Sequence, residues 1–326
     1  MKRPPRPEAL RIASRNSPLA MWQARYVKQA LERAHPQLEV SILGFTTQGD
    51  RLLDRSLSKV GGKGLFVKEL ETALLDGHAD IAVHSMKDVP MVLPDGLVLP
   101  VLCPREDPRD ALVCPGFADL ANLPAGARVG TSSLRRQCQL SAQFPHLEIR
   151  ELRGNVNTRL AKLDEGQYDA IVLATAGLLR LEMAARIRQR IPVELLLPAA
   201  GQGAVGIECR AEDQRSLAYI KVLHDRVSGA VVAAERAVNR RLQGGCQVPV
   251  ASYAELDGNE LYLRALVGSV DGKTLIGGEL RGPADEAESL GLHLADQLLA
   301  DGAEAVLAQF FRDQGDDASL FSDSHE

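Results

Sequence analysis

One stretch of this chain concentrates positive charge where a helix is expected to begin. Residues 128–159 contain six arginines but only two acidic residues, Glu148 and Glu151, although the whole chain has a net charge of −5. The hydroxyl residues 131–133 come directly before Leu134-Arg135-Arg136, so hydroxyls and unpaired backbone N–H groups would lie beside two guanidinium groups. This pattern favours a site for carboxylates, which arginine binds in bidentate fashion. The alternative is a solvated helix face.

Two other positions could take part in a reaction. Lys87 and Asp88 follow an apolar segment, and strand ends are where α/β folds hold their chemistry. Asp88 could therefore act as a general acid or stabilise a cationic nitrogen; the alternative is a turn residue in a surface salt bridge. Cys246 lies in the glycine-flanked loop 244–249, where a thiol can be reached and modified. Most cysteines are instead small, buried apolar residues.

The elements that must position these residues alternate between strands and helices. Pro18 begins a helix predicted to run to about Ala34. We then expect a strand at 40–45, a helix at 65–75 and a strand at 80–83.

The same layout recurs further along the chain. Arg11 to Asn16 is similar to Arg128 to Ser133, and the run from Gly64 to Asp80 is similar to that from Gly154 to Asp169. We therefore expect two similar α/β lobes with mainly parallel sheets. Ligands of such lobes favour helix N-termini at strand ends and the cleft between domains.

The C-terminal third follows a different pattern. A helix from about Val227 to Leu242, three strand-like segments between 248 and 280, and a last helix over 284–311 predict a separate α+β domain. The end of the chain, from about 313 to 326, is acidic and polar, and we expect it to be disordered.

Composition excludes several classes of protein. The net charge of −5 and an aromatic content of 4% argue against nucleic-acid binding. No apolar run is long enough to cross a bilayer and no signal core follows the N-terminus, so a cytoplasmic protein is expected. The five cysteines lack a CxxC pair and the seven histidines are scattered, which predicts no metal site. Gly201–Gly206 spells GxGxxG, but no strand precedes it, which argues against a nicotinamide-dependent oxidoreductase.

Together these motifs resemble the porphobilinogen deaminase family. The resemblance runs in order from about Leu10 to the final helix and leaves out the N-terminal extension and the acidic tail. Its matching stretches are residues 11–20, 60–69, 82–90, 105–110, 129–139, 152–156, 197–210 and 244–249.

The resemblance implies an enzyme, a transferase of porphyrin biosynthesis. Such an enzyme condenses four porphobilinogen molecules head to tail into hydroxymethylbilane, with release of ammonia. It carries a dipyrromethane cofactor, made from its own substrate and held by a thioether to Cys246. The expected enzyme is a cytoplasmic monomer that needs no metal, nucleic acid or membrane. The alternative from another class is a non-catalytic, two-lobed protein that binds small anions.

The resemblance also assigns roles to individual residues. It makes Asp88 the catalytic residue, which faces the pyrrole nitrogen and stabilises the positive charge left there when ammonia departs. It assigns the cofactor to Lys87, Thr131, Ser133, Arg135 and Arg136. It assigns the substrate and growing chain to Arg15, Ser17, Gln23, Lys59, Arg153, Arg159, Arg180 and Gln202.

The family fold implies three domains. Residues 1–103 with 204–221 would form a first α/β lobe carrying the catalytic aspartate. Residues 104–203 would form a second α/β lobe with the arginine-rich face. Residues 222–326 would form the smaller C-terminal α+β domain with the cofactor cysteine. The two lobes are expected to be like those of periplasmic binding proteins.

Overall fold

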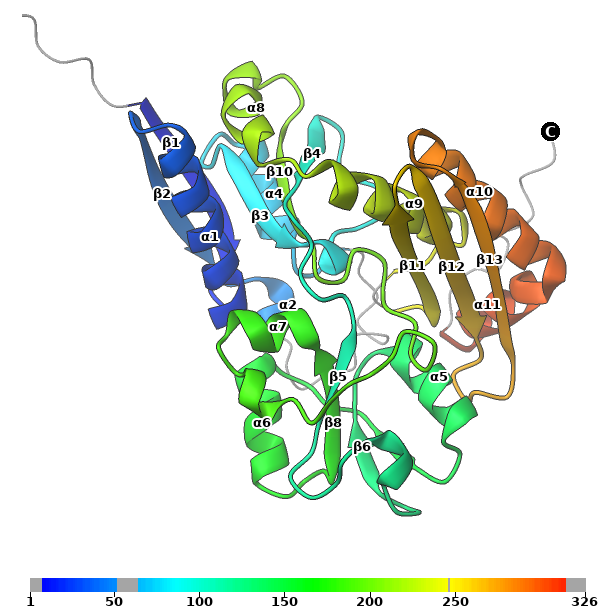
Figure 1. Cartoon of the computed structure of the whole chain (residues 1–326). Coiled ribbons are helices and arrows are strands. Elements are labelled where there is room, and N and C mark those ends of the chain that lie inside the picture. The colour runs from blue at the N-terminus through cyan, green and yellow to red at the C-terminus, as the bar shows by residue number, and fades with distance from the viewer. Residues whose placement is uncertain (1–7, 52–63, 246, 315–326) are drawn as a thin grey trace, which may run out of the picture. The chain divides into compact units, whose positions relative to one another are not determined.

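The computed structural model describes residues 8–51, 64–245 and 247–314 (Figure 1). The chain divides into two compact units. One contains Met1–Leu52, Lys63–Glu106 and Ala204–Gly229, and the other contains Leu53–Gly62, Asp107–Gly203 and Ala230–Glu326. The first unit holds a five-stranded sheet, here called lobe 1. The second holds another five-stranded sheet, lobe 2, and the three-stranded sheet of the C-terminal domain. The expected fold class, two similar α/β lobes with a smaller α+β domain, is confirmed.

Lobe 1 has the strand order β2-β1-β3-β10-β4. Strand β1 is parallel to β2 and β3, whereas β10 is antiparallel to β3 and β4. The strands are β1 (Glu8–Arg15), β2 (Leu38–Phe45), β3 (Ile81–Ser85), β4 (Leu97–Leu102) and β10 (Val205–Arg210). The helices are α1 (Pro18–Ala34), α2 (Gln48–Arg51), α4 (Lys68–Leu75) and α8 (Gln214–Ile220). Because β10 lies between β3 and β4, the chain returns to lobe 1 after completing lobe 2.

Helix α1 shows how local sequence sets these elements. Ser17 caps it by accepting a hydrogen bond from the Ala20 backbone N at 3.4 Å, and Pro18 occupies the first turn, where no backbone donor is needed. Its apolar face, with Val27 and Leu31 fully buried, packs against the sheet beside Ile12. The helix runs from Pro18 to Ala34, as predicted.

Lobe 2 has the strand order β7-β6-β8-β5-β9. Here β6 is parallel to β7 and β8, and β5 is antiparallel to β8 and β9. The strands are β5 (Asp110–Val113), β6 (Arg128–Gly130), β7 (Glu148–Arg150), β8 (Ala170–Ala174) and β9 (Gln189–Arg190). The helices are α5 (Leu134–Gln143), α6 (Val156–Asp164) and α7 (Thr175–Arg180). The two lobes therefore share one topology.

The repeat seen in the sequence extends to individual hydrogen bonds. In lobe 1, the Asp80 carboxylate accepts three hydrogen bonds from Arg11. They come from the backbone N, Nε and Nη2 of Arg11, at 2.7, 3.0 and 2.9 Å. In lobe 2, Asp169 accepts the same three bonds from Arg128, at 2.7, 2.9 and 2.9 Å. These pairs align the two lobes residue by residue.

The C-terminal domain is an antiparallel three-stranded sheet covered by helices. Its strands are β11 (Val250–Asp257), β12 (Glu260–Gly268) and β13 (Leu275–Pro283), and its helices are α9 (Arg226–Arg241), α10 (Ala287–Leu298) and α11 (Glu304–Gln314). The single last helix predicted over 284–311 is interrupted at Gly302, whose φ of 106° is not helical. Helix α11 continues to Gln314, so Asp313 does not begin a disordered tail; residues 315–326 lie outside the described residues.

Short helices complete the chain. They are the 3₁₀ helices η1 (Met86–Asp88), η2 (Leu120–Asn122), η3 (Ala184–Arg186), η4 (Lys221–Leu223) and η5 (Ala284–Glu286), and the π-helical turn η6 (Leu299–Ala303).

The turn between β12 and β13 supports helix α5 of lobe 2. A Cβ added to Gly268 would lie 2.8 Å from Cys138 Sγ, and one added to Gly272 would lie 2.5 Å from the Ala142 backbone N. Only glycine fits so close to the helix. The C-terminal domain therefore holds the helix that presents Arg135 and Arg136.

Candidate active site

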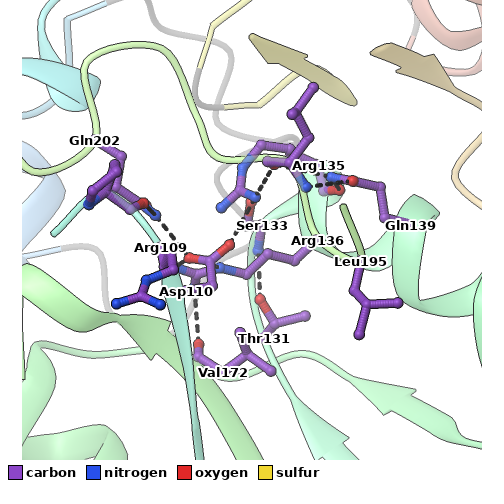
Figure 2. Close-up of polar contacts among 12 residues, drawn as sticks. Arg109, Asp110, Thr131, Ser133, Arg135, Arg136, Gln139, Val172, Leu195 and Gln202 are labelled. Carbon is purple, nitrogen blue, oxygen red and sulfur yellow. Dashed lines mark hydrogen bonds and ion pairs between the residues drawn. The ribbon is translucent and has the colours of Figure 1, made fainter. Parts of the chain in front are cut away.

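A buried carboxylate lies at the centre of the polar residues of lobe 2 (Figure 2). Asp110, the first residue of β5, is fully buried and binds Arg135 Nη1 at 2.8 Å and Arg136 Nη2 at 2.7 Å. Burial acts to raise the pKa of Asp110, but the charges and hydrogen bonds of the two arginines outweigh it and hold that pKa well below its usual range. Two guanidinium charges face one carboxylate charge, so this centre has a net charge of +1.

The two arginines differ in their remaining donors. Arg136 donates through Nε and Nη2 to Asp110 and through Nη1 to the Val172 carbonyl at 2.8 Å. Arg135 donates through Nη1 alone, to Asp110 and to the Leu197 carbonyl at 2.7 Å, and its buried Nε has no hydrogen-bond partner among the described residues. An unpaired buried donor is costly unless a ligand satisfies it. The Nε edge of Arg135 therefore suits one oxygen of a carboxylate.

The N-terminus of α5, whose first turn contains Arg135 and Arg136, adds backbone donors. Ser133 is its N-cap residue, but its side chain makes no capping bond, and its backbone N donates to Thr131 Oγ1 at 3.2 Å. N–H groups in the first turn of a helix lack intrahelical partners and attract anions. Thr131 itself is buried. The structure thus brings four predicted cofactor residues of lobe 2 together: Thr131, Ser133, Arg135 and Arg136.

Gln202 binds the same centre, and Arg180 binds the residue that follows Gln202. The buried Gln202 donates through Nε2 to Asp110 Oδ1 at 2.9 Å and to the Pro108 carbonyl at 2.7 Å. Arg180, at the end of α7, donates to the Gly203 carbonyl at 2.7 Å. Glu235 of α9 fixes the neighbouring turn by accepting from the Gly201 backbone N at 2.6 Å. Both predicted substrate residues are therefore held by backbone contacts of the 201–203 turn or by Asp110.

The rest of the arginine-rich stretch is largely neutralised in pairs. Arg153 binds Glu151 at 2.6 Å, and Arg159 of α6 donates to the Gly154 carbonyl at 2.7 Å and to Ser132 Oγ at 3.3 Å. Arg128 and Arg150 pair with Asp169 and Glu148. The sequence therefore overstated the exposed positive charge of this stretch, because two further carboxylate partners, Asp110 and Asp169, lie outside it.

Lobe 1 places the candidate catalytic residue at the end of a buried strand. Lys87 and Asp88 belong to η1, directly after β3, and both are half-buried. The buried Gln23 of α1 donates through Nε2 to Ser85 Oγ, the last residue of β3, at 2.9 Å. This bond ties α1 to the strand end from which Asp88 follows.

Arg15 and Ser17 lie at the junction of β1 and α1. Arg15 binds Asp50 through Nε at 3.2 Å and through Nη2, and its guanidinium lies 4.4 Å from the centroid of the Phe66 ring. Although burial acts to raise the pKa of Asp50, the hydrogen bond and charge of Arg15 and the bonds of Thr47 lower it. Ser17 serves as the cap of α1.

Two predicted site residues, Lys59 and Cys246, lie outside the described residues. The other four cysteines, Cys103, Cys114, Cys138 and Cys209, are all buried. Burial raises the pKa of Cys138 to about 12 and that of Cys209 to about 11, so both thiols stay protonated at neutral pH.

The sequence did not single out Asp110. The sequence feature that could have revealed it is a carboxylate at the start of the apolar strand Asp110–Val113. In the structure this carboxylate is the counter-charge of Arg135 and Arg136. A buried arginine is almost always paired, which is the argument that would have found it.

The fold and this site define an α/β protein with a buried, net-positive arginine centre at a helix N-terminus, an arrangement that suits a carboxylated ligand. Residues 10–218 match the family model described as porphobilinogen deaminase, dipyromethane cofactor binding domain, and residues 230–300 match porphobilinogen deaminase, C-terminal domain. The chain belongs to the porphobilinogen deaminase family. It is a transferase of porphyrin biosynthesis that uses porphobilinogen and a dipyrromethane cofactor. The family match supports this enzyme rather than a non-catalytic binding protein.

Solved structures to which this chain is similar include a periplasmic domain and two binding proteins. The periplasmic VFT2 domain of Bordetella pertussis BvgS is 17% identical, with a TM-score of 0.41, and the match covers 65% of this chain and 85% of that one. The methionine-binding protein MetQ is 13% identical, with a TM-score of 0.42 and coverage of 67% and 90%. The periplasmic aliphatic sulphonate binding protein SsuA from Escherichia coli is 16% identical, with a TM-score of 0.41 and coverage of 97% and 87%. Separately, none of the helices in the described ranges is both long and apolar enough to span a membrane.

Proposed function

We propose that this chain condenses four porphobilinogen molecules head to tail into hydroxymethylbilane, on a dipyrromethane primer joined by a thioether to Cys246. The observation that carries the residue-level proposal is the Asp110 centre, with its net positive charge and the unpaired Nε of Arg135. When bound, the cofactor supplies a pyrrole carbon that is extended and a set of acetate and propionate carboxylates. The donor edge of Arg135 and the N-terminus of α5 fit such carboxylates.

The proposed roles in lobe 2 follow from which donors are already used. Asp110 holds Arg135 and Arg136 in fixed positions, so Arg135 can bind a cofactor carboxylate without first losing side-chain entropy. Thr131 and Ser133 add hydroxyl donors next to it. We assign the growing chain of carboxylated pyrroles to Arg153, Arg159, Arg180 and Gln202, and to Lys59, which lies outside the described residues.

The proposed roles in lobe 1 centre on Asp88. Its carboxylate balances the positive charge that develops at the substrate's pyrrole nitrogen as ammonia leaves, and it can carry a proton at that atom. Lys87 precedes it in η1 and would bind a cofactor carboxylate. Gln23 holds the strand end through Ser85, and Arg15 and Ser17 would bind substrate carboxylates.

The attachment of the cofactor is tested by mass. The intact protein should exceed its sequence mass by one dipyrromethane, and peptide mapping should place that mass on Cys246. Cys246→Ser should abolish it, because a hydroxyl is a far weaker nucleophile than a thiol with a pKa of about 8.5. Cys209→Ala, which removes a buried thiol, is the matched control and should keep the added mass. Active protein without added mass on Cys246 would contradict the assignment.

The carboxylate assignment is tested by charge removal. Arg135→Leu or Arg136→Leu should block cofactor assembly, since each loses charge-assisted hydrogen bonds of roughly 1.5–3 kcal/mol. Arg150→Leu, which removes an exposed arginine paired with Glu148, is the control and should load normally. Full cofactor occupancy with normal activity in Arg135→Leu would rule out the proposed role of that side chain.

We also propose that the enzyme acts as a cytoplasmic monomer without a metal, and that its domains are residues 1–103 with 204–221, 104–203 and 222–326. Light scattering of the purified protein tests whether it is a monomer, since a dimer would have twice the mass. Activity that survives extensive chelation tests the requirement for a metal.

A further inference from the structure

Lobe 1 buries three ionisable side chains that have no part in the site described above. Glu71 of α4, His84 of β3 and Glu208 of β10 are 7%, 5% and 0% exposed. His84 Nε2 lies 2.8 Å from Glu208 Oε2. Oxygen Oε1 of Glu71 and Oε1 of Glu208 are buried and have no hydrogen-bond partner among the described residues. This Glu71–His84–Glu208 cluster therefore contains two carboxylates, one imidazole and unused acceptors.

The cluster is not required by the fold, as lobe 2 shows. Counting from the equivalent residues Asp80 and Asp169, Glu71 corresponds to Leu160, nine residues earlier, and His84 to Leu173, four residues later. Glu208 pairs in register with Ala82 and Val113 with Ile171, each two residues after the aligned aspartate, so Glu208 corresponds to Val113.

The three equivalent residues of lobe 2 form an ordinary apolar core. Leu160, Leu173 and Val113 are 4%, 3% and 2% exposed and belong to one hydrophobic cluster. Buried ionisable groups with unused acceptors are unfavourable, and apolar replacements of similar volume are often neutral or stabilising. Lobe 1 therefore retains its cluster for a reason other than folding.

The cluster lies directly behind the segment that carries Asp88. His84 is in β3, and the strand ends at Ser85, just before η1 (Met86–Asp88). In the register of the sheet His84 pairs with Gly206, and a Cβ on Gly206 would lie 2.3 Å from the sulfur of Met86. In lobe 2 the position of Asp88 is taken by Gly177, inside α7. The cluster and the candidate catalytic carboxylate thus occur together in one lobe and are both missing from the other.

We propose that Glu71, His84 and Glu208 are positioning residues for Asp88: the contact between His84 and Glu208 joins β3 to β10 behind the strand end, Glu71 lies on α4, which packs on both strands, and the protonation of Glu71 sets the charge next to η1. This inference rests on the proposed catalytic role of Asp88.

The protonation state of Glu71 in this cluster changes close to neutral pH. Burial, together with the charge of Glu208, raises the pKa of Glu71 to about 6, while His84 acts to lower it. The charges that act on Glu71 among the described residues are therefore Glu208 from β10 and His84 from β3. Above this pKa Glu71 carries a negative charge in the core of lobe 1. The geometry is not that of a metal site, because no group of three or more potential ligands in the described ranges could hold a metal ion.

The decisive variant gives lobe 1 the core of lobe 2. We expect Glu71→Leu/His84→Leu/Glu208→Val to fold with an unchanged or higher melting temperature and to keep the cofactor mass. Its kcat should fall about tenfold or more while KM changes less than about threefold, because an interaction that matters in the transition state has been lost. Glu39→Gln, an exposed change on β2, is the control and should match the parent.

Glu71→Gln tests the proton directly and keeps the shape of the side chain. The parent should lose stability as pH rises from about 4.5 through about 6, since a group with a raised folded pKa favours the folded state only while it is protonated. Glu71→Gln should lack this loss, and its kcat profile should lack the inflection that we expect for the parent near pH 6. If the triple variant does not fold, this pH profile alone decides, and a profile identical to that of the parent overturns the proposal.

Asp88→Asn, measured beside these variants, separates the two proposals. If Asp88→Asn is inactive while the triple variant keeps its kcat and pH profile, the cluster is structural only and this inference is wrong. If Asp88→Asn is active, the proposed catalytic role fails, and the positioning role fails with it.

Discussion

At the same places in one topology, the two lobes bury different charges. Lobe 1 has His84 and Glu208 where lobe 2 has Leu173 and Val113. Lobe 2 has Asp110 where lobe 1 has Val205, since these residues pair with Ala174 and Ser85 at the ends of β8 and β3.

The difference shows what each lobe contributes. The buried centre of lobe 2 contains two arginines and one carboxylate, which suits a carboxylated ligand. The buried cluster of lobe 1 contains two carboxylates and one imidazole, which suits the holding of a proton. The Arg11–Asp80 and Arg128–Asp169 pairs are the same in both, so they belong to the scaffold rather than to the chemistry.

Asp88→Asn should give the largest effect, because no residue of lobe 2 can replace a group that only lobe 1 provides. The asparagine keeps the shape but loses the negative charge and the exchangeable proton. Ammonia release in a single turnover should fall about 10²–10⁴-fold while bound cofactor, followed by intact mass, is retained. Asp76→Asn, an exposed residue at the end of α4, is the control and should match the parent. Release by Asp88→Asn within about threefold of the parent rate would make Asp88 structural.

Asp110→Asn should cost lobe 2 about 3–5 kcal/mol, because it leaves Arg135 and Arg136 buried without a counter-charge. The pKa of Asp110 is held below its usual range, so this carboxylate stabilises the fold above the ordinary value of 3.8 and loses that effect as pH falls through its folded pKa. In urea unfolding, the gap between parent and variant should be constant from neutral pH to about pH 4 and should narrow below it.

The control for this prediction is Asp164→Asn, which breaks an exposed pair with Arg186 and should cost less than about 1 kcal/mol. The two lobes should differ in the pH range of their effects. For Glu71→Gln in lobe 1, the stability difference from the parent should appear as pH rises through about 6, not as it falls below about 4. A gap for Asp110→Asn that widens at acid pH would contradict the charge pairing.

Sequence reasoning succeeded where signals are local. Ser17 and Pro18 marked the start of α1, and the Gly77 and Gly166 turns, with φ of 69° and 75°, marked the ends of the repeated helices. Asp88 was correctly placed just after a buried strand.

It missed the groups whose partners are distant in sequence. Asp110 meets Arg135 and Arg136 only in the folded lobe, 25 and 26 residues away, and His84 meets Glu208 across 124 residues. A sequence pattern shows the type of each residue but not which buried charge another will neutralise. For the same reason the arginine-rich stretch suggested more exposed charge than the structure contains.

The smallest effect concerns how each lobe fills the space beside β1 in lobe 1 and beside β6 in lobe 2. Gly130 of β6 corresponds to Ala13 of β1, two residues after the aligned arginines. A Cβ on Gly130 would lie 2.8 Å from the Tyr168 ring and 3.1 Å from Ile171 Cγ2. In lobe 1 the residues equivalent to Tyr168 and Ile171 are Ala79 and Ala82. In lobe 2, Gly130 therefore leaves space for the large side chains of Tyr168 and Ile171. In lobe 1, Ala13 packs with the small residues Ala79 and Ala82.

Gly130→Ala should destabilise the protein by about 1–3 kcal/mol, because a methyl group in a filled core displaces its neighbours. Gly116→Ala is the control: its Cβ would meet nothing within 4 Å, so the change should be neutral or slightly stabilising. Combining Gly130→Ala with Ile171→Ala should cost less than the sum of the two single changes, since the methyl group enters the space that isoleucine leaves. Additive costs within about 0.5 kcal/mol would show that the two positions do not share that space, and the residue-by-residue correspondence of the lobes would fail at this point.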